Sequence, residues 1–231
     1  MRKQQQGFTL IEIAIVLVII GLLLGGVLKG QELIQNARVR NVIAQQDGIK
    51  AAFFGFQDRY RGIPGDYSPT LANQNIPGAG TTCGGNGDSL IKNTTFTGSA
   101  SSENICAWYH LSKANFITGS YSGSGTTENA NNSPVNPFGG PMQIIYDSTY
   151  SDPSGSPSSV HNIKTGINIP ASILAEVDRK LDDGYPSSGA FRFSTYGSVT
   201  AASCIVAGTA PAPDTWSIAS GATVCGGASL F

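Results

Sequence analysis

The residues from Phe8 to Leu28 form a continuous apolar run with a single charged side chain, Glu12. As an α-helix rising 1.5 Å per residue, a run of this length spans about 30 Å, which matches the hydrocarbon core of one bilayer. No second run of this kind follows, so the chain crosses a membrane at most once. Arg2 and Lys3 precede the run, and this placement predicts a cytoplasmic N-terminus and an exported body.

The charges divide the chain into two unlike parts. Residues 1–61 carry eight Lys or Arg and four Asp or Glu, whereas residues 62–231 carry six and eleven. The whole chain of 231 residues has a formal charge of −1. The acidic body argues against nucleic acid as a partner. Only two histidines are present, which excludes a His-rich metal site.

A secretory signal peptide and a plain membrane anchor are two simple explanations of the apolar run. A signal peptide ends its apolar core at small residues of the A-x-A type. Here the run continues into Val27–Glu32, VLKGQE, which is a poor cleavage site. A plain anchor leaves Glu12 unexplained, because a charged side chain at the bilayer centre costs about 2.5–3.5 kcal/mol. An acid in this position therefore indicates a function.

The residues Gly7–Glu12 read GFTLIE and follow a short basic leader, residues 1–6. Together with the apolar run, they resemble the N-terminal signature of type IV prepilins. The resemblance extends over residues 1–61. It implies that a membrane peptidase, the prepilin peptidase, cuts the chain between Gly7 and Phe8. It also implies that the new Phe8 amine is methylated.

The same resemblance implies a structural role. It predicts a subunit of a type IV pilus or pilus-like filament, whose partners are other pilin subunits, the prepilin peptidase, an assembly platform in the inner membrane and, before assembly, membrane lipid. The subunit would cross the inner membrane once with its head outside the cytoplasm, and then enter an extracellular filament or a periplasmic pseudopilus.

Glu12 has a physical role in such an assembly. Cleavage after Gly7 creates a positive amine on Phe8, and Glu12 is the only acid among residues 8–31. Leaving one charge unpaired in an apolar bundle costs about 3–5 kcal/mol. We therefore expect Glu12 to pair with the Phe8 amine of a neighbouring subunit and to set the register of docking. The alternative is an acid that reaches the membrane interface.

A helical pattern continues beyond the apolar run. Apolar side chains recur every three or four residues, and the breaker sequence Gly62–Gly65, GIPG, ends the pattern. We expect one helix from Phe8 to Arg61, with its second half buried against the body. The predicted organisation is a leader at 1–7, a transmembrane and stalk helix at 8–61 and a globular exported head at 62–231. The buried stripe comprises Val39, Val42, Gln46, Ile49, Phe53, Phe56 and Tyr60.

The head is predicted to be α+β, with the long N-terminal helix packed on an antiparallel sheet of four or five strands and with loops pinned by disulfides. Residues 62–102 and 119–140 are rich in Gly, Ser, Asn and Thr and predict loops. The remaining segments predict helices at 103–115 and 170–181 and strands at 142–146, 161–169, 190–195 and 199–207, with one more in 215–225.

The four cysteines, Cys83, Cys106, Cys204 and Cys225, fit an oxidised exported domain. Four cysteines allow three pairings. We favour Cys83–Cys106 and Cys204–Cys225, because each closes a short local loop and would contribute about 3–3.5 kcal/mol by loop-closure entropy. The second loop would match the C-terminal disulfide region that is common in pilins.

Few residues in the head suggest chemistry. Asp178, Asp182 and Asp183 lie close in sequence and are candidates for calcium, although their spacing is not that of an EF-hand. The alternative is a set of helix-end and turn acids. His110 lies in an apolar helix and is expected to be a packed core residue. The chain has no H-E-x-x-H, G-x-S-x-G or P-loop motif, so we expect neither catalysis nor a cofactor.

Two other functions remain open. One is a pseudopilin of a type II secretion system. The other is a minor pilin that acts as an adhesin or binds DNA. Adhesion would use the loops at 68–102 and 119–140, and DNA binding is disfavoured by the excess of acids in the head. Softer resemblances to a group of prepilin-like proteins with a Pro-Gly-Asp turn occur at Phe56–Tyr67, at Trp108–Leu111 and at Glu176–Gly189.

Overall fold

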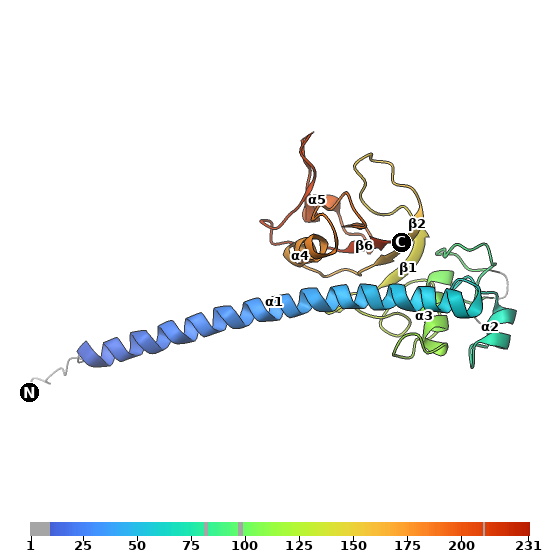
Figure 1. Cartoon of the computed structure of the whole chain (residues 1–231), viewed down its shortest axis with the longest axis horizontal. Helices are drawn as coiled ribbons and strands as arrows, with labels where there is room; N and C mark the ends of the chain where they lie inside the picture. The colour runs from blue at the N-terminus through green and yellow to red at the C-terminus, as the bar shows by residue number, and fades with distance from the viewer. Residues whose placement is uncertain (1–9, 81–82, 97–98, 210) are drawn as a thin grey trace, which may run out of the picture. The chain divides into compact units, whose positions relative to one another are not determined.

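The computed structural model describes residues 10–80, 83–96, 99–209 and 211–231 (Figure 1). The first element is the helix α1 (Leu10–Tyr60), which has 51 residues. It ends because Arg61 adopts a left-handed backbone with φ of 54°, and Pro64 then prevents its continuation. The end of the predicted helix is thus confirmed, and its first residues, Phe8 and Thr9, lie outside the described residues.

The chain divides into two compact units, Met1–Arg38 and Val39–Phe231. In the described part of the first unit, α1 is the only element, and its large apolar side chains are exposed. The second unit contains the rest of α1 and every other described helix and strand.

The second half of α1 carries the buried stripe that the sequence predicts. Val39 and Val42 join one apolar cluster, which includes Leu174 and Phe191. The later positions Ile49, Phe53 and Phe56 join a second cluster, built mainly with the aromatic and aliphatic residues Trp108, Leu111, Ile144 and Ile163. The head therefore has two cores, and one face of α1 contributes to both.

The main sheet has four antiparallel strands in the order β1-β2-β6-β3. These strands are β1 (Gln143–Asp147), β2 (Val160–Lys164), β6 (Gly227–Leu230) and β3 (Phe191–Phe193). Ile144 lies opposite Ile163, and both side chains are buried against the helices. A two-stranded sheet pairs β4 (Ile205–Val206) with β5 (Thr215–Trp216). The predicted α+β class is confirmed.

The two predicted head helices are confirmed as α3 (Glu103–Lys113) and α4 (Ala171–Leu181). The prediction of loop throughout 62–102 was wrong, because this segment contains α2 (Pro69–Asn75). The helix begins where the Ser68 hydroxyl accepts a hydrogen bond from the Leu71 amide at 3.3 Å and proline follows the cap.

The C-terminal strands differ most from the prediction. The expected strand at 199–207 begins instead as a short helix, α5 (Ala201–Cys204), and only β4 is extended. Two alanines favour the helical turn, which places Cys204 opposite its partner. Sequence reasoning missed β6 because its residues, GASL, have weak strand propensity. The strand forms because β2 and β3 pair with its two edges.

Both disulfides follow the local pairing that the sequence favoured. Cys83 is bonded to Cys106, with their Cα atoms 5.3 Å apart, and this bond ties the loop after α2 to α3. Cys204 is bonded to Cys225, with a Cα separation of 5.7 Å, and this bond ties α5 to the segment before β6. All four cysteines are buried.

Candidate assembly site and polar clusters of the head

The predicted cleavage residues Gly7 and Phe8 lie outside the described residues. Glu12 is described, and it lies in the first turn of α1, exposed among exposed apolar side chains. A carboxylate at this position also interacts favourably with the positive end of the helix dipole. Its pairing with the Phe8 amine of a neighbouring subunit stays a prediction.

The apolar part of α1 satisfies the length and composition of a membrane span. Its most apolar window of 18 residues has a mean hydropathy of 2.8, and none of that window is buried by the rest of the chain. Among the described residues, this is the one helix with these properties. A helix that is apolar on all sides requires lipid or other apolar helices around it.

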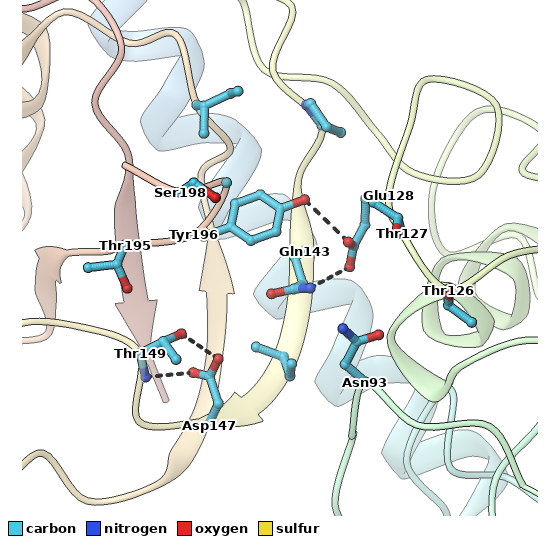
Figure 2. Close-up of a pocket in the computed structure, with 14 residues that line it drawn as sticks. Asn93, Thr126, Thr127, Glu128, Gln143, Asp147, Thr149, Thr195, Tyr196 and Ser198 are labelled. Atoms are coloured by element: carbon cyan, nitrogen blue, oxygen red, sulfur yellow. Dashed lines mark hydrogen bonds between the residues drawn. The ribbon is translucent and has the colours of Figure 1, made fainter. Parts of the chain in front are cut away.

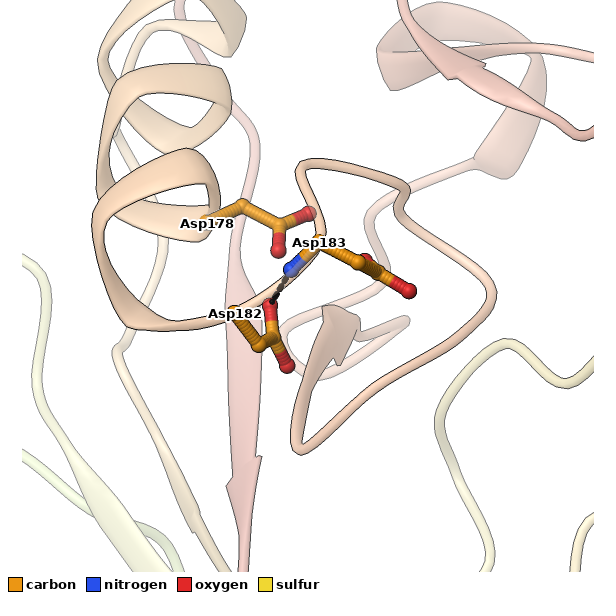
Figure 3. Close-up of side chains that lie close together, drawn as sticks. All are labelled: Asp178, Asp182 and Asp183. Carbon is orange, nitrogen blue, oxygen red and sulfur yellow. Dashed lines mark hydrogen bonds between the residues drawn. The ribbon is translucent and has the colours of Figure 1, made fainter.

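Asp178, Asp182 and Asp183 lie together at the end of α4, where one oxygen of each is within 4.8 Å of the others (Figure 3). Asp178 is buried and accepts a hydrogen bond from the Trp216 indole at 2.6 Å. Asp182 accepts hydrogen bonds from the backbone amides of Asp183 at 2.8 Å and Phe191 at 2.9 Å. Asp178 and Asp182 therefore make contacts at the helix end and with β3 and β5, and calcium binding by the three acids stays a prediction.

Burial and, next to it, a hydrogen bond to Asp182 together raise the pKa of Asp178 to about 8, although the hydrogen bond from the Trp216 indole opposes the rise. Burial alone would also raise the pKa of Asp182, but the hydrogen bonds from Asp178 and from backbone amides lower it overall. At neutral pH, Asp178 thus keeps its proton and donates it to Asp182. The end of α4 is thus hydrogen-bonded to β3 through Asp182 and to β5 through Asp178.

His110 is buried in α3, as predicted. Its Nδ1 accepts a hydrogen bond from the Gly65 amide at 3.1 Å, so Nε2 carries the hydrogen and donates it to the Cys83 carbonyl at 3.2 Å. Burial lowers its pKa to about 4. The ring is therefore neutral and joins the turn after α1 to the first disulfide.

A second pair of acids, Asp66 and Glu103, holds the loop between α2 and α3. The Asp66 carboxylate accepts hydrogen bonds from the backbone amides of Gly87 at 2.7 Å and Ser89 at 2.6 Å. The Glu103 carboxyl accepts one from the backbone amide of Lys92 at 2.8 Å. Burial raises the pKa of Glu103 to about 8, and the charge of Asp66 and a hydrogen bond to it act in the same direction. Sequence reasoning missed this pair, although an acid in a Pro-Gly-Asp turn and an acid at a helix start were both visible.

A polar network that the sequence did not indicate lines a cavity of about 450 Å³ (Figure 2). Glu128 accepts hydrogen bonds from the Gln143 amide at 2.7 Å and from the Tyr196 hydroxyl at 3.3 Å. Asp147 lies on the same cavity and accepts hydrogen bonds from Thr149. Glu128 and Tyr196 are 68 residues apart in sequence, and the fold brings both to the cavity beside β1.

One family model matches the chain, the prokaryotic N-terminal methylation motif, at residues 2–28. No curated protein and no solved structure matches it. The match covers the basic leader, the GFTLIE sequence and the apolar run, and it confirms the resemblance found in the sequence. The motif favours a structural subunit rather than an enzyme. The chain therefore carries the N-terminal signature of type IV prepilins, which supports a pilin-like or pseudopilin protein.

Proposed function

We propose that this chain is a structural subunit of a type IV pilus or pilus-like filament, assembled through α1 after its leader is removed. The observation that carries the proposal is the methylation motif at residues 2–28, which continues into a helix whose apolar side chains are exposed. Other copies of such a helix, or lipid before assembly, would cover this surface. The disulfide-bonded head fits an exported, oxidising location.

The proposed organisation has a leader at 1–7, a transmembrane and stalk helix at 8–61 and a head at 62–231. The prepilin peptidase would cut after Gly7, where the missing side chain allows close approach to the backbone. The subunit would cross the inner membrane once, with the head outside the cytoplasm. Glu12 would then pair with the methylated Phe8 amine of the next subunit.

The test is the chemistry and location of the mature protein. Mass spectrometry of its N-terminal peptide should find a chain that begins with N-methylphenylalanine at Phe8. Electron microscopy of sheared surface filaments, with identification of their subunits, should find this chain in a fibre. A mature chain that begins beyond Leu28 would overturn the proposal, and filaments confined to the periplasm would indicate a pseudopilus instead of a surface pilus.

A further inference from the structure

The cavity beside Glu128 is formed entirely within the unit Val39–Phe231. It lies between the loop at 126–128, the strand β1 and the turn at 195–198 (Figure 2). Its volume of about 450 Å³ is within the range of about 300–1,000 Å³ that is common for small-molecule sites. A single sugar-sized ring with some bound water would fit this volume.

Glu128 gives the cavity a fixed acceptor. Its side chain is 6% exposed, and the amide that faces it, Gln143, is 5% exposed. Asn104 and Gln143 both donate to Oε1, and the Tyr196 hydroxyl donates to Oε2 at 3.3 Å. Burial raises the pKa of Glu128, although these hydrogen bonds oppose that rise. The carboxyl is therefore held in one orientation at the wall of the cavity.

The charges around the cavity disfavour an anionic ligand. Its lining contains two acids, Glu128 and Asp147, and no Lys, Arg or His. Asp147 is balanced by the buried Lys164, whose Nζ lies 2.9 Å from Oδ1. Burial alone would raise the pKa of Asp147, but the charge of Lys164 and the hydrogen bonds lower it overall. A carboxylate or phosphate on a ligand would thus find no cation in the lining to compensate its charge.

The rest of the lining presents hydroxyl groups and some apolar surface. Hydroxyl groups come from Thr126, Thr127, Thr195 and Ser198, and apolar surface comes from Ile145. Hydroxyls both donate and accept hydrogen bonds, which suits a ligand that does the same at several positions. A pyranose ring has this character, because each of its hydroxyls can both donate and accept a hydrogen bond and its C–H groups present an apolar face.

We propose that this cavity binds the ring of a neutral pyranose sugar. Glu128 and Gln143 would accept and donate hydrogen bonds to adjacent ring hydroxyls, while the threonine hydroxyls hold the opposite edge. This function is independent of filament assembly, because the cavity uses no residue of the N-terminal motif.

The experiment is saturation-transfer NMR on the full chain in micelles of a detergent without sugar. The neutral probes are methyl β-D-galactopyranoside, methyl β-D-glucopyranoside and methyl α-D-mannopyranoside. Lactose shows whether the cavity takes the end of a chain or only an isolated ring. N-acetylneuraminic acid is the anionic probe, and ethanolamine is the cationic probe. We expect saturation transfer to at least one neutral glycoside and none to the anion or the amine.

Two variants locate the binding. Glu128→Gln should weaken the affinity for the bound glycoside at least tenfold. Thr195→Val should weaken it about three- to tenfold, the effect of one hydrogen bond. Thr195 is exposed, and none of the described residues forms a hydrogen bond with its hydroxyl, so this variant is expected to fold even if Glu128→Gln does not. The control is Thr70→Val on α2, another exposed threonine, which should leave binding unchanged.

Three results would overturn the proposal. The first is no transfer to any neutral glycoside at about 20 mM probe, a concentration that detects millimolar affinity. The second is transfer that Thr195→Val does not reduce. The third is a preference for ethanolamine, which would show that Glu128 serves as an amine site. None of these results bears on the filament proposal, whose own test is the N-terminal peptide.

Discussion

Glu103 offers a direct test of the buried acid pair at the start of α3, because glutamine copies the protonated form of its side chain. In the folded chain this carboxyl has a pKa of about 8, against an ordinary value of 4.5. It keeps its proton because burial disfavours the charge and because Asp66, beside it, is also an acid. Folding therefore takes up a proton between these two pH values, and the stability of the head falls as pH rises through this range.

The magnitude follows from the same values. A change in pKa from 4.5 to about 8 corresponds to at most about 5 kcal/mol, and about 3 kcal/mol of this is lost between pH 5.5 and 8. The amides of Asn86 and Lys92 stabilise the ionised form, and the pKa of about 8 already includes their effect. We expect the wild type to lose about 1–3 kcal/mol of unfolding free energy between pH 5.5 and 8. Glu103→Gln keeps a donor toward Asp66 and an acceptor for one of the two amides, and it cannot ionise, so it should not lose stability as pH rises.

The assay is denaturant unfolding of the full chain in detergent, followed by tryptophan fluorescence, since Trp108 is buried in α3. At pH 5.5, Glu103→Gln should be less stable than the wild type by at most the value of one hydrogen bond, about 0.5–1.5 kcal/mol. Between pH 5.5 and 8.5, the difference in stability should shift by about 1–3 kcal/mol in favour of Glu103→Gln. The ionisation of Asp178 changes the unfolding free energy equally in both proteins, so its contribution cancels when the two are compared. The control is Glu176→Gln, an exposed acid on α4. Parallel stability curves for wild type and Glu103→Gln from pH 5 to 9 would refute the reasoning.

Three further predictions address assembly and stability. Glu12→Ala should still be cleaved and inserted but should enter filaments poorly; immunoblots of sheared filaments against membrane fractions test this, and normal incorporation would exclude the charge pair. Lys164→Met should cost about 3–5 kcal/mol in urea unfolding, because Asp147 is left without its cation, and adding Asp147→Leu should restore most of it. Replacing both Cys204 and Cys225 with alanine should cost about 3 kcal/mol, and no change in the urea midpoint would contradict this.

The sequence predicted the features that depend on local pattern. The stripe from Val39 to Phe56 was visible because helical periodicity repeats within a few residues. The disulfides were predictable because each pair is close in sequence. The helix α2 was missed because its seven residues contain only short polar and small side chains besides Leu71.

The polar clusters depend on contacts between distant segments, and no local pattern reveals them. Glu128 and Tyr196 are 68 residues apart, and each looks like an ordinary loop residue in the sequence. Asp66 and Glu103 meet only because the turn after α1 lies against α3, where a Cβ on Gly65 would collide with the Glu103 carbonyl oxygen. The strand β6 likewise depends on its two neighbours and not on its own residues.

The two disulfides, each of which closes a short loop, also limit how far the head can be extended by force. They join residues separated by 23 and 21 positions. At about 3.4 Å per residue, the two segments enclosed by the disulfides have a contour length of about 150 Å, and this length cannot be extended while the bonds are intact. A fibre subunit that is pulled until its head opens would therefore lengthen less than its number of residues suggests. Reduction of both bonds would make the same subunit markedly more extensible.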